Sequence, residues 1–195
     1  IPAPTQDLDG KKTSCVRPGC SLHLHAVLAI RNLGHVFAST APGIMMGVGS
    51  MGDRLRPYGE CDTFISTDAG LSWRMVARGP HKHVFADQGG LLVMAADAPS
   101  IEVVQYSFDY GTTWTTLALP EAIEPVVLTS VPDGTALKIL LLGGRRAKTA
   151  HERYASVFID FAVLSKRKCA QADFERFYPA TPHGSCVFGR CLLYT

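Results

Sequence analysis

The chain has 195 residues, of which 47% are hydrophobic and 18% charged, and its formal net charge is +2. This composition is typical of one soluble globular domain, or of part of a larger one. The Lys and Arg residues are scattered, which argues against a nucleic-acid-binding protein. No apolar run reaches the roughly 18 residues that predict a membrane span.

The N-terminal segment is rich in proline and polar residues. It opens on Ile1-Pro2-Ala3-Pro4, with neither an initiator methionine nor a signal peptide. We therefore expect a processed product or a fragment, and one that begins inside a repeat.

Strand-like segments separated by Gly, Pro and Asp clusters follow in three sets. The predicted strands cover 22–30, 43–49, 62–66 and 72–76, then 83–86, 91–95, 101–107 and 113–119, then 125–129, 137–142 and 154–161. A fourth strand for the third set must come from elsewhere or be missing. The only predicted helix covers 172–178.

Two stretches with the pattern S-x-D-x-G-x-x-W organise the first two sets, and we call each an Asp box. Their patterned residues are Ser66, Asp68, Gly70 and Trp73 in the first box and Ser107, Asp109, Gly111 and Trp114 in the second. The boxes lie 41 residues apart, as expected for one blade of a β-propeller. The sequence therefore predicts an all-β, partial β-propeller of about three four-stranded blades.

A structural role explains the residue types of the boxes. The Asp side chain can accept backbone N–H groups at a hairpin tip, Gly supplies the positive φ of the tip, and Trp buries its ring between sheets. A carboxylate held by its own turn is a poor general base. We therefore predict no catalytic residue among them.

Other motifs give weaker signals. Gly47 to Gly52 matches G-x-G-x-x-G, but a loop containing Pro57 follows where a dinucleotide site needs a helix. Cys20, His23 and His25, and likewise His81 and His83, are residue types that bind zinc. We read them as a disulfide cysteine and strand histidines, and we predict no metal and no cofactor.

The six cysteines indicate an oxidising compartment, although fifteen pairings are possible. Cys15 and Cys20 enclose a Val-Arg-Pro-Gly turn that could bring them within bridging distance. No N-glycosylation site occurs.

Several motifs, in order along the chain, resemble the C-terminal part of the sortilin-type propeller, and most closely that of the fungal vacuolar protein-sorting receptors. Besides the Asp boxes, they are Cys20-Ser-Leu-His-Leu-His25, Ala41-Pro-Gly-Ile-Met-Met-Gly-Val-Gly-Ser-Met-Gly-Asp53, Gly79-Pro-His81, Asp87-Gln-Gly-Gly90, and Ile159-Asp-Phe161 leading to Lys166-Arg-Lys-Cys169. The resemblance covers the chain from about Asp7 to Gly189.

The resemblance implies a ten-bladed lumenal propeller followed by a cysteine-rich module, a membrane span and a cytosolic tail. Residues 1–165 would be the last blades and 166–195 the truncated start of the module. The resemblance also pairs Cys15 with Cys20 and Cys169 with Cys186, and it leaves Cys61 and Cys191 unassigned. Family ligands are held largely inside the propeller tunnel, and no ligand-binding residue is assigned here.

The implied function is that of a non-catalytic sorting receptor in the lumen of the Golgi, endosome or vacuole, with vacuolar hydrolases or propeptides as cargo. The remaining propeller blades would be structural partners. One alternative is an Asp-box glycoside hydrolase related to sialidases, although no arginine cluster or Tyr–Glu motif indicates it. A third reading is a structural piece completed by another chain across its open strand edges.

Overall fold

The computed structural model describes residues 1–4, 6–11, 15, 19–25, 42–145, 154–164, 170–173, 186–187 and 190–191. The chain divides into two compact units, residues 1–162 and 163–195. The described regular structure is β-strand with short 3-10 turns, so the predicted all-β class is confirmed. The predicted helix 172–178 overlaps the 3-10 turn η5 (Gln171–Asp173), and its residues 174–178 lie outside the described part of the chain.

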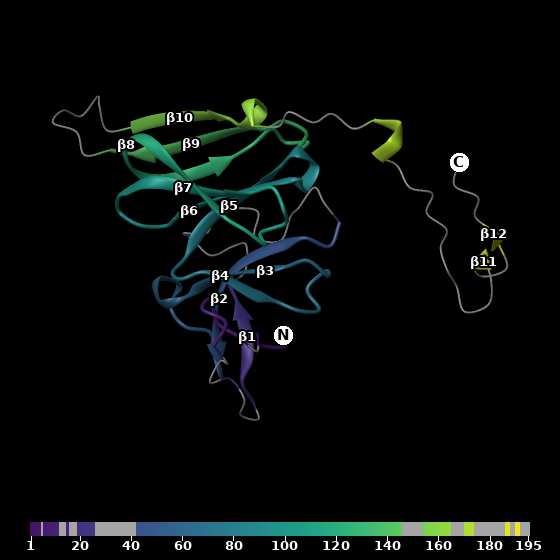
Figure 1. The fold of residues 1–195 in the computed structure, drawn as a ribbon. Helices are drawn as coiled ribbons and strands as arrows, with labels where there is room; N and C mark the ends of the chain where they lie inside the picture. The colour runs from purple at the N-terminus through teal and green to yellow at the C-terminus, as the bar shows by residue number, and fades with distance from the viewer. Residues whose placement is uncertain are drawn as a thin grey trace. The chain divides into compact units, whose positions relative to one another are not determined.

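The first set of strands forms one antiparallel four-stranded sheet in the order β1-β2-β3-β4 (Figure 1). Its strands are β1 (Ser21–Leu24), β2 (Met45–Gly52), β3 (Asp62–Ser66) and β4 (Arg74–Ala77). The 3-10 turn η1 (Tyr58–Glu60) lies between β2 and β3. This meander is the expected propeller blade.

The second and third sets form one six-stranded sheet in the order β10-β9-β8-β7-β6-β5 (Figure 1). Its strands are β5 (His81–Ala86), β6 (Leu91–Ala96), β7 (Ile101–Ser107), β8 (Thr115–Thr129), β9 (Lys138–Gly144) and β10 (Tyr154–Asp160). The 3-10 turns η2 (Asp87–Gly89) and η4 (Phe161–Val163) follow β5 and β10. In the C-terminal unit, β11 (Cys186–Val187) pairs with β12 (Arg190–Cys191).

The long strand β8 differs from the prediction of two separate strands. Its first half pairs with β7, through Tyr106 opposite Thr115, and its second half pairs with β9, through Thr129 opposite Leu140. Register irregularities occur on both sides, and β8 carries Pro120 and Pro125. Proline lacks the N–H that a regular ladder requires, but a strand tolerates it next to such irregularities.

Buried side chains pack the successive strand sets against each other face to face. One cluster joins β2, β3 and β4 to β5 and β6, and it includes Met46, Ile65, Phe85 and Leu92. A second cluster joins β5, β6 and β7 to β8, β9 and β10. Strand β6 contributes to both clusters because alternate residues of a strand point to opposite faces, which explains its continuous apolar sequence Leu-Leu-Val-Met-Ala-Ala. Face-to-face packing of successive sheets is the arrangement of a partial propeller.

Candidate functional site

The first Asp box closes the hairpin between β3 and β4. The Ser66 hydroxyl donates to Asp68 Oδ1 at 2.8 Å and accepts the Gly70 N–H at 2.8 Å. The Asp68 carboxylate also accepts the Ser72 N–H at 2.8 Å and the Ser72 hydroxyl at 2.5 Å. Gly70 has a φ of +87°, and the buried Trp73 donates its indole N–H to the Gly70 carbonyl at 3.1 Å.

The second Asp box has the same geometry between β7 and β8. Asp109 accepts the Ser107 hydroxyl at 2.7 Å, the Thr113 N–H at 2.9 Å and the Thr113 hydroxyl at 2.6 Å. Gly111 has a φ of +76° and donates its N–H to Ser107 Oγ at 2.8 Å. The Trp114 ring is only partly buried, unlike that of Trp73. Its indole N–H is buried and meets no acceptor in the described part of the chain.

A direct contact links the two boxes. The Arg74 guanidinium, at the start of β4, donates to the Tyr110 carbonyl in the second box at 3.1 Å. The Trp114 ring packs on the cluster that contains Ile65 of β3. Each box therefore contributes to the seam between neighbouring blades as well as to its own hairpin.

The carboxylates of the boxes are held in the ionised state. Hydrogen bonds from Thr113 and Ser107 lower the pKa of Asp109 to about 2, and bonds from Ser72 and Ser66 lower the pKa of Asp68. A carboxylate whose lone pairs accept N–H and O–H donors is a weak proton acceptor near neutral pH. The boxes are thus built as turns, with no feature of an acid–base site.

The structure contains a disulfide between Cys15 and Cys20, with a Cα–Cα distance of 5.3 Å. Cys61 is a buried free thiol that donates to the carbonyls of Arg56 and Pro57. Burial raises the pKa of this thiol. Cys169 and the side chain of Cys186 lie outside the described residues, so their pairing stays a prediction.

The glycine-rich motif from Gly47 to Gly52 lies within strand β2, which pairs with β1 and β3. Only the three-residue 3-10 turn η1 lies between it and β3, with no α-helix, so the backbone lacks the shape of a dinucleotide-binding loop. The ring nitrogens of His23, His25 and His81 contact the carbonyls of Gly52, Arg56 and Gly79, respectively. Within the described ranges, no three His, Cys, Asp or Glu residues gather as metal ligands would.

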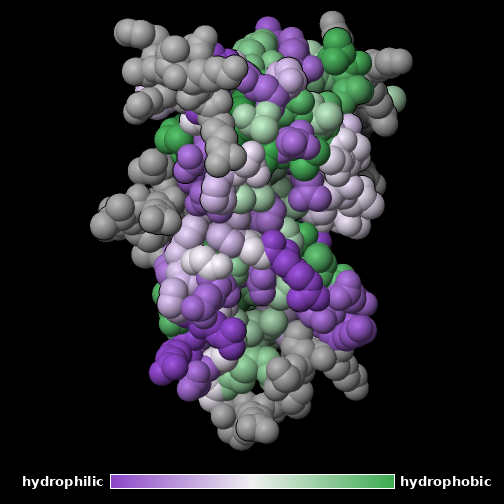
Figure 2. All heavy atoms as spheres, turned by 90° about the vertical axis from the view of Figure 1, so that its left-hand side faces the viewer, coloured by the Kyte–Doolittle hydropathy of each residue, from purple (hydrophilic) through white to green (hydrophobic). Residues whose placement is uncertain are grey.

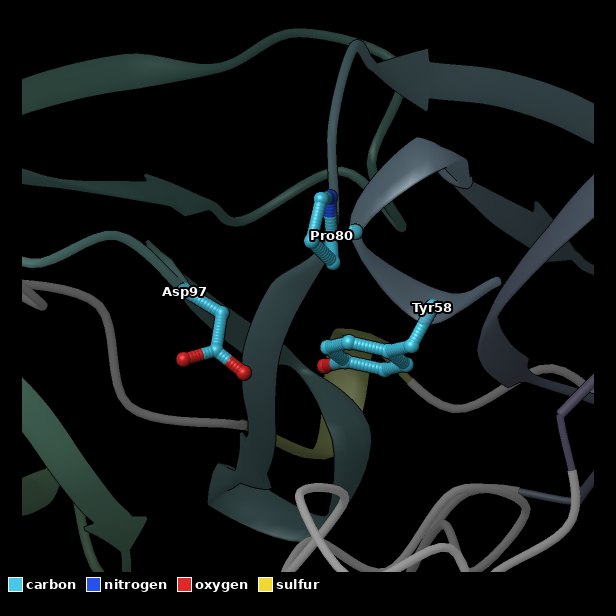
Figure 3. Close-up of a pocket in the computed structure, with 4 residues that line it drawn as sticks. Tyr58, Pro80 and Asp97 are labelled. Atoms are coloured by element: carbon cyan, nitrogen blue, oxygen red, sulfur yellow. The ribbon is translucent and has the colours of Figure 1, made fainter. Parts of the chain in front are cut away.

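A hollow lies between the first two strand sets, at the end of the strands opposite the Asp boxes (Figure 3). It has a volume of about 320 Å³ and is lined by Tyr58, Gly59, Pro80 and Asp97. The Tyr58 hydroxyl and the Asp97 carboxylate point toward one another across it (Figure 3). The Lys82 ammonium forms an ion pair with Asp97 at 3.1 Å.

The Tyr58 hydroxyl is buried and has no hydrogen-bond partner within 3.5 Å in the described part of the chain. Burial of the ring, and next the negative charge of Asp97, raise the pKa of Tyr58 above its ordinary value. The phenol therefore stays protonated near neutral pH. A tyrosine nucleophile of the sialidase type needs the opposite shift, so Tyr58 gives the hydrolase alternative no support.

A wider hollow of about 770 Å³ occupies the equivalent place one strand set further along. Its lining residues are Pro99, Ser100, Ala122, Glu124, Gly144, Arg145 and Tyr154. Like the first hollow, it lies between the loop after the second strand of one set and the start of the next set. It adjoins an ion pair between Arg145 and Glu121, with an N–O distance of 3.2 Å. The two hollows have the volume of ligand recesses, and they are the candidate contact sites on this end.

Figure 2 faces the end of the N-terminal unit where β9 leads to β10, and it shows hydrophobic side chains (green) in small patches separated by hydrophilic ones (purple). The sequence prediction assigned a ligand-binding role to none of the residues that line the two hollows. The repeated spacing of the loops was the one available signal.

Comparison with known protein families shows to which family the chain belongs. A family model described as "Sortilin, neurotensin receptor 3" matches residues 1–128. A second model, described as "Sortilin, neurotensin receptor 3, C-terminal", matches residues 130–195. The chain belongs to the sortilin family. The resemblance predicted from the sequence motifs is thereby confirmed.

Sortilin-family relatives from fungi match most of the chain. It is 44% identical to the vacuolar protein sorting/targeting protein 10 of Mycosarcoma maydis over 95% of its length, and 44% identical to that of Laccaria bicolor over 91%. The protein of the same name from Aspergillus flavus is 40% identical over 90%. The chain spans only 12–13% of the length of these relatives. No helix among the described residues is long and apolar enough to cross a membrane.

Proposed function

We propose that the chain is the last part of the lumenal propeller of a vacuolar sorting receptor, together with the start of its cysteine-rich module. In this proposal residues 1–165 belong to the propeller and 166–195 to the module. The similarity to fungal vacuolar protein sorting/targeting proteins over most of the chain is the observation that carries the proposal. The Cys15–Cys20 disulfide supports a place in the oxidising lumen of the Golgi, endosome or vacuole.

The role is binding rather than catalysis. The Asp-box carboxylates accept hydrogen bonds from their own turns, and the Tyr58 hydroxyl stays protonated. We propose that protein cargo, namely vacuolar hydrolases or propeptides, inserts side chains into the hollows between blades. The wider hollow offers Ser100, Glu124 and Arg145 as polar groups.

The remaining blades of a longer receptor are the structural partners in this proposal. Strand sets that have a neighbour bury the facing side chains, as Ile65 and Leu92 show. The outer face of the last set instead exposes Leu142, Tyr154 and Phe158, at 38%, 80% and 62%. A further blade packed on that face would cover them as the observed blades cover each other.

A chimeric receptor tests the function. The 195-residue chain replaces the matching segment of the Mycosarcoma maydis relative, and the vacuolar and secreted fractions of a vacuolar hydrolase are measured. We expect normal sorting, whereas a chimera that reaches the Golgi but secretes its cargo contradicts the proposal. Release of the fluorophore from a fluorogenic sialoside by the purified chain would favour the hydrolase alternative instead.

The hollows are tested in the same chimera. Ser100→Trp fills the wider hollow with a large ring, so we expect more of the hydrolase to be secreted. Leu71→Trp is the matched control, because Leu71 is 76% exposed at the Asp-box end of the sheet. Equal sorting by the two variants would remove the hollow from the proposal and leave the receptor role intact.

A further inference from the structure

The first hollow, lined by Tyr58, Gly59, Pro80 and Asp97, contains two polar groups with unused hydrogen-bonding capacity. The Tyr58 hydroxyl is shielded from bulk water and meets no acceptor within 3.5 Å among the described residues. Asp97 Oδ2 accepts the Lys82 ammonium at 3.1 Å, whereas Asp97 Oδ1 accepts no hydrogen bond from the described part of the chain. A buried hydroxyl without a partner is rare and costs free energy, so a group that enters the hollow would complete it.

Both polar groups are held in place by their own surroundings. Tyr58 belongs to the 3-10 turn η1, where its carbonyl accepts the Cys61 N–H at 3.1 Å. Its ring lies edge-on to the His25 ring, with centroids 5.4 Å apart. Asp97 donates its N–H to the Pro80 carbonyl at 2.9 Å. Because these contacts order both side chains in advance, a ligand in the hollow loses little free energy to their ordering.

The charges around the hollow favour a neutral ligand. The Asp97 carboxylate repels an anion. A cation would have to compete with the Lys82 ammonium, whose side chain is only 11% exposed and already pairs with Asp97. The Tyr58 phenol is itself neutral near pH 7, because burial raises its pKa. A neutral polar group is therefore the kind of ligand that this wall can bind.

The way in which the two groups face each other selects a hydroxyl. The Tyr58 hydroxyl and the Asp97 carboxylate point toward one another across the hollow (Figure 3). A single ligand oxygen that carries one hydrogen and two lone pairs can accept from Tyr58 and donate to Asp97 at the same time. A carboxamide has its donor and acceptor on two separate atoms, which suits partners that lie side by side. The facing arrangement therefore fits an aliphatic hydroxyl better.

The size of the hollow indicates how much of a ligand enters with that hydroxyl. Its volume of about 320 Å³ corresponds to about ten water molecules. A Ser or Thr side chain fills only a small part of this space, whereas a hexose, with about twelve non-hydrogen atoms, matches it. The Pro80 ring and the Tyr58 ring supply apolar surface for the C–H groups of a sugar, as expected of a pocket with few polar groups.

We propose that the first hollow is a carbohydrate site that binds one neutral hexose unit of a glycan. One hexose hydroxyl bridges Tyr58 Oη and Asp97 Oδ1, and the C–H face of the ring packs on Pro80 and on the Tyr58 ring. The site binds sugar without cleaving it, because Asp97 is the one carboxylate among the described lining residues and glycoside hydrolysis needs two acids. The inference rests on the proposed function only for the source of the glycan, a glycosylated hydrolase cargo.

The test is an NMR titration of the full 195-residue chain, labelled with nitrogen-15, against methyl α-mannopyranoside and methyl α-glucopyranoside. At least one of these neutral hexosides should shift the Gly59 and Asp97 amide signals saturably, with a Kd of about 1 mM or weaker. N-acetylneuraminic acid, an anionic sugar, should leave these signals unchanged, because Asp97 repels its carboxylate. The inference is overturned if neither hexoside gives a saturable shift, which would leave only water in the hollow, or if only the anionic sugar binds.

A peptide and two variants identify the ligand and its contact. The peptide acetyl-Gly-Ser-Gly-amide offers a hydroxyl without a sugar ring, so binding as tight as that of the hexoside would refute a carbohydrate site. Tyr58→Phe removes only the bridging hydroxyl, and the Kd for the hexoside should rise about five- to tenfold. Tyr110→Phe is the matched control, because Tyr110 is 49% exposed in the second Asp box. Equal hexoside affinity of the two variants would contradict the proposed contact.

Folding and cargo sorting are measured separately from sugar binding. Tyr58→Phe should leave the midpoint of urea unfolding unchanged or raise it, because the hydroxyl that it removes is unpaired in the unliganded chain. A weaker hexoside affinity in this variant therefore reports the lost contact and not a loss of fold. A lowered midpoint would mean that the hydroxyl already has a partner, against the inference. A chain that sorts cargo in the chimera but binds no hexoside refutes this inference alone and leaves the receptor role intact.

Discussion

The two Asp-box tryptophans should respond differently to the same substitution. Trp73→Phe and Trp114→Phe both remove the pyrrole part of an indole ring. In the first box this also removes the hydrogen bond from the Trp73 indole to the Gly70 carbonyl. In the second box it removes an N–H that is buried and unpaired in the described part of the chain.

The magnitude follows from the cost of each polar group. The lost packing should cost about 1–2 kcal/mol in free energy of unfolding at either site. Loss of the hydrogen bond adds about 1 kcal/mol for Trp73, whereas relief of the unpaired N–H returns about 1–3 kcal/mol for Trp114. We therefore expect Trp73→Phe to be the more destabilising change by about 2 kcal/mol or more.

Urea unfolding followed by far-UV circular dichroism measures the difference. The chain has two tryptophans, so each variant retains one, and its fluorescence reports on the box that was left unchanged. Equal losses at the two sites, or a larger loss for Trp114→Phe, would refute the reasoning, because the Trp114 N–H would then be making a favourable interaction.

Three further predictions concern the boxes and the free thiol. Gly111→Ala should lower the free energy of unfolding in urea melts more than Gly70→Ala does. Both glycines have positive φ, but a Cβ at Gly111 would lie 2.9 Å from the Ile65 side chain, whereas the nearest atom to a Cβ at Gly70 lies at 3.6 Å. Equal losses would mean that φ strain alone matters. Because the folded pKa of Asp109 is about 2, below its unfolded value of about 3.9, its contribution to stability should be full above pH 4 and fall as the pH drops toward 2. Urea melts of the unaltered chain and Asp109→Asn should then converge in acid, and a constant gap from pH 7 to 2 would contradict the shift. Cys61 should react with a thiol reagent at pH 7 only as fast as the chain unfolds locally, because burial both shields the thiol and raises its pKa. Rapid labelling of Cys61 in the folded chain, detected by mass spectrometry, would disprove this.

The sequence was most informative about features that residues close together in the chain form among themselves. The Asp boxes predicted hairpins because Ser, Asp and Gly act within one turn, and the strands around them follow from alternating apolar residues. The predicted strands 113–119 and 125–129 left a break that the structure does not have, because β8 pairs with β7 and then β9 and tolerates Pro120 and Pro125. Tertiary packing decides such cases, and a local pattern does not encode it.

The candidate site was less predictable for the same reason. Tyr58 and Asp97 come together only because two successive strand sets pack face to face, and neither residue belongs to a motif. The unequal burial of Trp73 and Trp114 likewise depends on their neighbours, since the two box sequences share one pattern.

The shared strand β8 determines where this repeat protein can be divided. Repeats in a propeller are commonly treated as interchangeable units that evolution can duplicate, delete or exchange. Residues 78–80, which link β4 to β5, offer a junction at which a whole unit can be exchanged without cutting a strand. No such junction exists between the second and third sets, because any cut there divides β8 and removes pairing from both. Recombination should therefore transfer residues 81–160 as one inseparable module.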